Sequence, residues 1–180
     1  MSKMTDDKAS EQWWLKPIQA LNTSEWEALC DGCGKCCLEK LEDDEGAGML
    51  FSIIACDHLR TKCGNSADGA ETKTVTCACY TKRLSRKTDC IKITPALLAE
   101  SAHWLPGTCA YRLRWEGKPL PDWHPLISGN KESVRQAGHS VADRAMLNDG
   151  RQTLTNAEKL ENLLANDEVD WEPLVIRDWS

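Results

Sequence analysis

Hydrophobic and polar positions alternate in short stretches along this chain, which predicts short strands and few long helices. The run MLFSIIAC at 49–56 is apolar and partly β-branched, and it predicts a buried strand. Residues 75–80 predict a second strand, in which Cys77 and Cys79 point the same way because alternate side chains share a face. Residues 61–74 are polar and show no periodicity, so we expect an exposed loop there.

Capping patterns predict three helices. The sequence SEWE at 24–27 is a capping-box pattern and predicts a short helix over about 25–30. Threonine followed by proline at 94–95 predicts an N-cap and first turn, and the Pro-Gly pair at 106–107 ends this helix. A second capping-box pattern, TNAE at 155–158, precedes an apolar face and predicts the third helix.

Tryptophans mark two segments outside the predicted helices and strands, a tail and an ordered loop. Residues 1–23 form a polar tail with anchors at the tryptophan pair 13–14. Residues 115–130 are rich in proline and glycine, and Trp115 and Trp123 are expected to hold this loop against the core.

These elements predict an α+β fold, a small irregular single domain organised around a cysteine-bound metal centre. We expect residues 24–130 to form the cysteine-rich metal-binding domain, after the tail at 1–23. Residues 131–180 are expected to be a C-terminal extension with one helix, packed on that domain.

Composition excludes several classes of protein. A net charge of −6 over 180 residues argues against a broad phosphate-binding surface, so nucleic acid is not an expected partner. The sequence contains no apolar run near the about 18–20 residues that span a bilayer. The first twenty residues are charged throughout and lack the h-region of a secretory signal, so the expected location is the cytoplasm.

The number and clustering of the cysteines indicate what chemistry this protein performs. Ten cysteines in 180 residues amount to about 5.6%, below the about 8–10% typical of a small disulfide-stabilised protein. In the reducing cytoplasm, clustered cysteines more often bind metal or do redox work than form disulfides. They all fall between residues 30 and 109.

The motif CDGCGKCC at 30–37 is the strongest signal for metal binding. Two residues between cysteines let one loop supply two thiolates to a tetrahedral ion. Here the spacing occurs twice and an adjacent cysteine follows. We expect the side chains of Cys36 and Cys37 to diverge and to chelate a single ion poorly, which favours a polynuclear centre or two neighbouring sites.

The motif leaves the metal open between zinc and iron, the iron as single ions or as an iron–sulfur cluster, because thiolate binds all of these. The spacing fits neither the bacterial ferredoxin run nor a radical-SAM loop. His124, in a proline-rich loop, is either a further ligand or a hydrogen-bonded structural histidine, and His58 follows Cys56 by two residues.

Several ordered motifs together resemble the YcgN family of bacterial proteins, which are grouped under a zinc- or iron-chelating CxxCxxCC domain. The motifs are SEWE and CDGCGKCCL within 24–38, TCACY at 76–80, DCIK at 89–92, TCAYR at 108–112 and PDWHPL at 121–126. The resemblance implies a cytoplasmic metal-binding protein without a settled activity. It also implies nine metal-site residues: Cys30, Cys33, Cys36, Cys37, Cys56, Cys77, Cys79, Cys90 and Cys109.

The chain departs from this family pattern in two places. Residues 61–74 resemble an insertion, and Cys63 lies inside it, so Cys63 is the least expected ligand. The region 131–168 is longer and more helical than the pattern.

The leading functional interpretation is a cysteine-rich metal-binding protein whose partners are metal ions. One alternative is a redox or group-transfer enzyme that uses the centre as a cofactor, with Tyr111, Arg112 and His124 as first candidates in a substrate pocket. The other is a protein-binding adaptor with a structural zinc. No nucleophile–base pair can be identified from the sequence.

Overall fold

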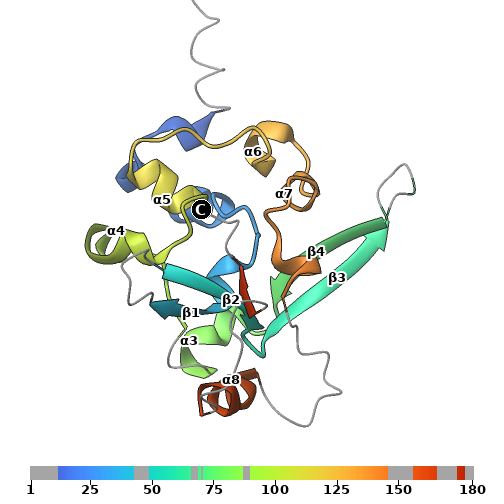
Figure 1. The fold of residues 1–180 in the computed structure, drawn as a ribbon. Coiled ribbons are helices and arrows are strands. Elements are labelled where there is room, and N and C mark those ends of the chain that lie inside the picture. The colour runs from blue at the N-terminus through green and yellow to red at the C-terminus, as the bar shows by residue number, and fades with distance from the viewer. Residues whose placement is uncertain are drawn as a thin grey trace, which may run out of the picture.

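Two hydrophobic clusters organise the protein, one among helices and one beside a small antiparallel sheet (Figure 1). The computed structural model describes residues 12–42, 49–65, 69, 71–86, 90–145, 156–165 and 174–176. Within these ranges, short helices and antiparallel strands confirm the predicted α+β class.

The helical cluster joins three helices to the 3-10 turns η1 (Trp13–Leu15) and η2 (Ile18–Ala20). The helices are α2 (Thr23–Ala28), α4 (Pro95–Ser101) and α5 (Ala110–Trp115). Its buried side chains are Ile18, Leu29, Leu98, Leu105, Ala110, Tyr111 and Leu120. Trp13, Trp14 and Trp115 pack against this cluster, as expected of anchors; residues 1–11 of the predicted tail lie outside the described residues.

N-cap side chains set where α2 and α4 begin, and the N-cap of α2 lies two residues before the predicted one. Thr94 caps α4 as predicted, because its hydroxyl accepts the Leu97 N–H at 3.2 Å. The capping box of α2 is formed by Asn22 and Glu25, so the predicted box at 24–27 was wrong. Asparagine caps as well as serine does, and this register turns Trp26 onto the ring of Tyr111, with 5.0 Å between centroids.

The three-stranded sheet has the order β1-β2-β5 and is antiparallel. Its strands are β1 (Leu38–Glu42), β2 (Met49–Ala55) and β5 (Val175–Ile176). Strand β2 confirms the buried strand predicted from the apolar run. The second cluster lies beside the sheet and contains Leu38, Phe51, Ala55, Leu59, Val141 and Ile176.

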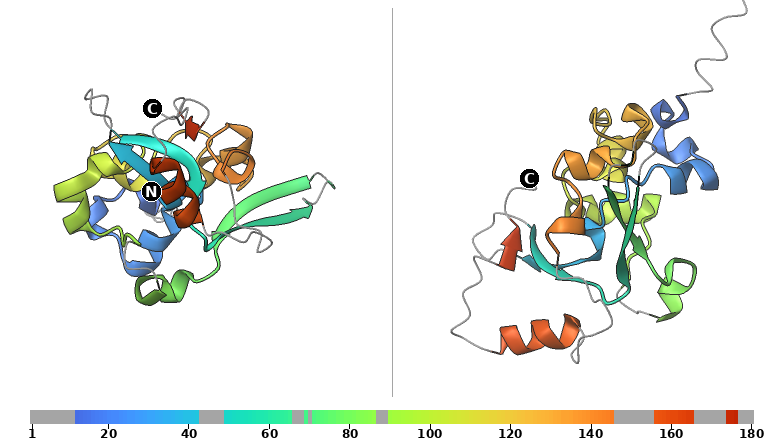
Figure 2. Two further views of the ribbon diagram at one scale, coloured as in Figure 1. Left: turned by 60° about the horizontal axis from the view of Figure 1, so that its bottom comes forward. Right: turned by 90° about the vertical axis from the view of Figure 1, so that its right-hand side faces the viewer.

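The segment 61–74, predicted to be a loop, lies mostly in a β-hairpin. Strands β3 (Leu59–Asn65) and β4 (Glu71–Cys77) pair in register and project from the body of the protein (Figures 1 and 2). Most of β3 is exposed, so the hairpin lacks the apolar alternation that reveals a half-buried strand in a sequence. Its β-branched residues, such as Thr74 and Val75, suit extended backbone.

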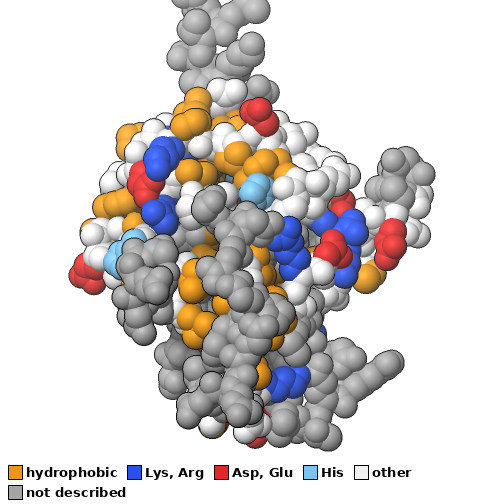
Figure 3. Space-filling view, in the orientation of Figure 1, with side chains coloured by type: hydrophobic (Ala, Val, Ile, Leu, Met, Phe, Trp, Pro, Cys, Tyr) orange, Lys and Arg blue, Asp and Glu red, His pale blue; other side chains and the backbone are white. Residues whose placement is uncertain are grey.

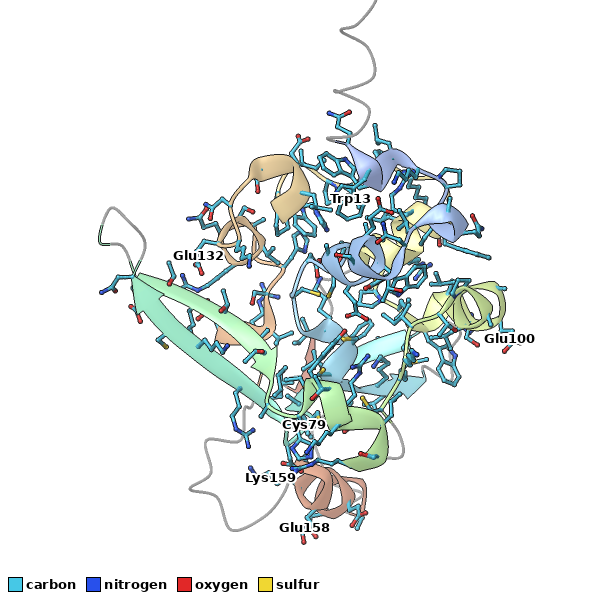
Figure 4. All side chains as sticks on the ribbon, turned by 180° about the vertical axis from the view of Figure 1, so that it is seen from behind. Trp13, Cys79, Glu100, Glu132, Glu158 and Lys159 are labelled. Carbon is cyan, nitrogen blue, oxygen red and sulfur yellow. The ribbon has the colours of Figure 1, made fainter. Side chains whose placement is uncertain are left out.

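Polar contacts hold the hairpin to the segment after residue 131. The Lys73 backbone N–H donates to Glu132 at 3.0 Å, and Figure 4 shows Glu132 beside the hairpin. Asp143 pairs with the side chains of both Lys73 and Arg135. Opposite charges lie side by side at this place in Figure 3.

The remaining elements are short. They are η3 (Lys35–Cys37), η4 (Tyr80–Lys82), α3 (Arg83–Arg86), η5 (Ala102–Trp104), α6 (Pro125–Ser128), α7 (Ser133–Gln136), η6 (Val141–Asp143) and α8 (Asn156–Leu164). The stretch 115–130 contains the single turn α6, where a loop was expected. Residues 131–180, expected to hold one helix, contain α7, η6, α8 and β5. Helix α8 was predicted, whereas Thr155 of its capping box lies outside the described residues. The predicted division at 23 and 130 stays a prediction.

Gly34 is a position that only glycine fits, and its replacement tests how the cysteine loop is packed. Its φ of 82° is left-handed, and a Cβ there would lie 2.7 Å from Val141 and 2.8 Å from Val75. We expect Gly34→Ala to reduce the free energy of unfolding by about 3 kcal/mol, combining backbone strain with overpacking. Gly32→Ala is the matched control: its φ is 73° but nothing lies within 4 Å, so only the strain of about 1–2 kcal/mol remains. Urea denaturation measures both, and equal losses would contradict the packing argument.

Candidate functional site

The cysteine loop begins where α2 ends and is shaped by short-range hydrogen bonds. Asp31 Oδ1 accepts the Cys33 N–H at 3.0 Å, and the Cys33 carbonyl accepts the Val141 N–H at 2.9 Å. Two left-handed glycines then turn the chain into η3, which carries Cys36 and Cys37. The loop is therefore fixed at both its start and its middle.

Tertiary contacts bring other cysteines to this loop. The Cys56 N–H, just past β2, donates to the Cys37 carbonyl at 2.8 Å. Cys77 ends β4, and Cys79 is buried in the turn beyond it, so the expectation that both lie on one strand was wrong. Their Sγ atoms nevertheless lie 3.8 Å apart. Figure 4 shows Cys79 where the base of the hairpin meets α3.

Mutual electrostatic effects divide the nine clustered cysteines into two groups. Cys36 raises the pKa of Cys30, Cys33 and Cys109, whereas Cys56 and Cys77 both raise the pKa of Cys37, Cys79 and Cys90, because a second thiolate nearby disfavours the first. The first thiol group is Cys30, Cys33, Cys36 and Cys109. The second thiol group is Cys37, Cys56, Cys77, Cys79 and Cys90.

Cys36 and Cys37 lie where the two groups meet. Their Sγ atoms are 3.9 Å apart, so the expected divergence of these adjacent side chains was wrong. A hydrogen bond from the Cys37 thiol, helped by the Lys40 ammonium, lowers the pKa of Cys36 to about 7. The same bond raises the pKa of Cys37, which keeps its proton. The Cys36–Cys37 pair therefore places the first and second thiol groups next to each other.

Desolvation raises the pKa of several other thiols in the two groups. Desolvation by the surrounding protein is the largest cause of the raised pKa values of Cys30, Cys33, Cys79 and Cys90, and it raises the pKa of Cys109 to about 12; Cys79 is buried, whereas Cys30 is exposed. A buried thiolate without a counter-charge is costly, so these groups are protonated at neutral pH. Any cation bound here would displace protons.

A cavity of about 930 Å³ lies against the thiols. Seven of the nine clustered cysteines line it, all except Cys33 and Cys109. Trp26, Trp104 and Tyr111 line its apolar wall, and Tyr80, whose hydroxyl donates to Glu27, borders it as well. The volume far exceeds that of a single ion, so the thiols face a space of small-molecule size.

Cys63 stands apart from the other cysteines. It is exposed on β3 opposite Lys73, and it does not line the cavity. All ten cysteines are free thiols. Within the described residues, no three His, Cys, Asp or Glu side chains are already placed to hold a metal ion together.

His124 is used structurally and has no nitrogen left for a metal. Its Nδ1 accepts the Leu126 N–H at 3.1 Å, so the proton is on Nε2, which donates to the Leu29 carbonyl at 3.1 Å. Burial lowers the pKa of His124, which keeps the ring neutral. The ring thereby holds the end of α2, one residue before Cys30.

The other two residues considered for an enzyme site also make structural bonds. The Tyr111 hydroxyl donates to the Trp26 carbonyl at 2.8 Å. Arg112 donates to the Leu105 carbonyl and pairs with Glu116. Both side chains hold the helical cluster together.

Sequence reasoning missed Asp31 and Lys35, which lie between the cysteines of the motif. Lys35 is fully buried and donates to the Thr108 hydroxyl at 3.1 Å, beside Cys109. Asp31 holds the turn at Cys33. The signal available was a charged residue inside each CxxC spacing, but its role depends on contacts that local spacing does not reveal.

Curated bacterial proteins are similar to most of this chain. A UPF0260 protein of Rhizorhabdus wittichii is 46% identical over 138 residues, which cover 77% of this chain and 85% of that protein. The chain belongs to the UPF0260 family. A UPF0260 protein of Rhodobacter capsulatus is 40% identical over 166 residues, covering 92% of this chain and 94% of the relative. A third, from Vibrio vulnificus, is 43% identical over 136 residues, covering 74% and 84%.

No protein-family model and no solved structure matches the chain. The names of the UPF0260 relatives state no activity, so the narrower resemblance to the YcgN family stays a prediction. Among the described residues, no helix is long and apolar enough to cross a membrane. The cytoplasmic location also stays a prediction.

Proposed function

We propose that this UPF0260 protein binds zinc or iron through its nine clustered thiols. The observation that carries the proposal is the gathering of cysteines from separate segments, from the loop at 30–37 to Cys109, while Cys63 lies apart. A protein that needed cysteine only as a small apolar residue would gain nothing from placing thiols within electrostatic range of one another.

The spacing of the closest thiols supports a thiolate centre. A tetrahedral ion with metal–sulfur bonds of about 2.3 Å places its sulfurs about 3.8 Å apart. The Sγ atoms of Cys77 and Cys79, both in the second thiol group, are 3.8 Å apart, too far for a disulfide and suited to one edge of a tetrahedron. Those of Cys36 and Cys37 are 3.9 Å apart, which keeps the two thiol groups next to each other. Binding of an ion would draw the other thiols of each group inward.

The donor set suits zinc and iron equally. Both metals accept thiolate, and an iron–sulfur cluster takes four cysteines. Bound zinc would contribute folding energy, and iron would add redox chemistry. Anaerobic purification, elemental analysis and an absorption spectrum distinguish the metals, and protein without any metal after loading would contradict the proposal.

Serine substitutions test which cysteines matter. We expect Cys33→Ser and Cys36→Ser to lose metal, because a hydroxyl is a far weaker ligand than a thiolate. Cys63→Ser is the matched control and should keep its full metal content, since Cys63 lies on the exposed hairpin. Metal content is measured on folded protein by elemental analysis. Loss of metal from Cys63→Ser alone would show that the assignment is wrong.

The cavity favours a second candidate, a redox or group-transfer enzyme with the centre as cofactor. A space of about 930 Å³ with aromatic walls is of the size that binds small molecules. The lowered pKa of Cys36 also provides a reactive thiolate there. An open metal position would change the visible spectrum of cobalt-loaded protein on addition of azide, whereas a closed structural site would not respond.

A further inference from the structure

Asp31 has one carboxylate oxygen that its protein surroundings leave without a partner. Its Oδ1 accepts the Cys33 N–H at 3.0 Å, which fixes the carboxylate in the turn between Cys30 and Cys33. Its Oδ2 is buried and has no hydrogen-bond partner in the part of the chain that the structure describes. The carboxylate is thus held in place by one oxygen while the other is free.

A buried carboxylate oxygen without a donor or counter-cation is strongly unfavourable. The charge of Asp31 pushes upward the pKa values of the four cysteines of the first thiol group and of His124. The His124 ring is neutral, and its Nε2–H is taken by the Leu29 carbonyl. The unsatisfied oxygen therefore lies near thiols that a bound cation would deprotonate, and the same cation would satisfy the oxygen.

We propose that Asp31 Oδ2 is an oxygen ligand of the metal ion held by Cys30, Cys33 and Cys109. This inference rests on the proposed function. Three thiolates and one carboxylate would complete a four-coordinate site once the ion drew them together, since the described residues hold no ready-made group of three ligands. Cys36 is left where the two thiol groups meet, 3.9 Å from Cys37.

An oxygen donor narrows the metals that fit. Carboxylate is a hard ligand, so a mixed sulfur–oxygen site favours borderline divalent ions such as Zn²⁺, Fe²⁺ and Co²⁺. It disfavours Cu(I), which prefers an all-sulfur set. The first thiol group would then differ in metal preference from an all-sulfur site.

The test compares cobalt(II)-loaded full-length protein with its Asp31→Asn variant. Asparagine keeps an oxygen to accept the Cys33 N–H, so the turn is retained while the negative charge at the second position is lost. We expect one bound ion to be held at least about 10-fold more weakly, with shifted ligand-field bands at saturation. The intensity of thiolate-to-cobalt charge transfer should not change. Asp122→Asn removes an exposed carboxylate and is the control.

Unchanged affinity and spectrum in Asp31→Asn would overturn the inference while leaving the proposed function intact. Failure of the unaltered protein to bind cobalt, zinc or iron would instead overturn the proposed function. X-ray absorption of the unaltered zinc-loaded protein is a second measurement that does not depend on folding of a variant. An oxygen shell at about 2.0–2.2 Å beside the sulfur shell supports the inference, and a sulfur-only shell overturns it.

Discussion

Removing the metal with a strong chelator is expected to lower the midpoint of thermal unfolding by more than about 10 °C. Among the described residues the buried apolar side chains form two small clusters, and seven cysteines line a cavity instead of adding to either core. Metal-binding energy becomes folding energy when the ligands are unorganised in the unfolded chain, and structural zinc contributes about 10–16 kcal/mol in small domains. Calorimetry before and after chelation measures the effect.

Two controls isolate the role of the metal. Adding zinc or iron back should restore the original midpoint. The same chelator added to the Cys33→Ser/Cys36→Ser double variant should have a smaller effect, because only the ion of the second thiol group is left for it to remove. An unchanged melt, with elemental analysis showing that the metal is gone, would contradict the prediction.

The second large effect concerns the number of ions. Nine thiols exceed the four that one zinc accepts, and they form two groups. We expect fully zinc-loaded protein to hold more than one ion. Cys109→Ser should empty the first thiol group and Cys79→Ser the second, and each variant should keep the ion of the other group. Elemental analysis of anaerobically prepared protein gives the metal-to-protein ratio.

A protein that binds a single ion would give the contrary result. A reproducible ratio of one, with the remaining thiols freely titratable under native conditions, would contradict a multinuclear centre and favour one structural zinc. Cys63→Ser serves again as the control, because the loss of an exposed thiol should not change the ratio.

Local signals in the sequence determined several elements of this protein. The α+β class, strand β2, the N-cap Thr94 and helix α8 follow from apolar runs, capping chemistry and periodicity, which act within a few residues. The spacing in CDGCGKCC likewise indicates thiol chemistry without reference to the fold. Cysteine 63 could be set apart because its surroundings are polar, and the structure does place it on an exposed strand.

Other features were decided only by contacts between distant segments. The hairpin of β3 and β4 has little apolar alternation and is held by Glu132 and Asp143 from far along the chain. The close approach of Cys36 and Cys37 and the division of the thiols depend on how Cys56 and Cys109 arrive at the loop. Burial and hydrogen bonding set the roles of these side chains, and both are properties of the folded chain as a whole.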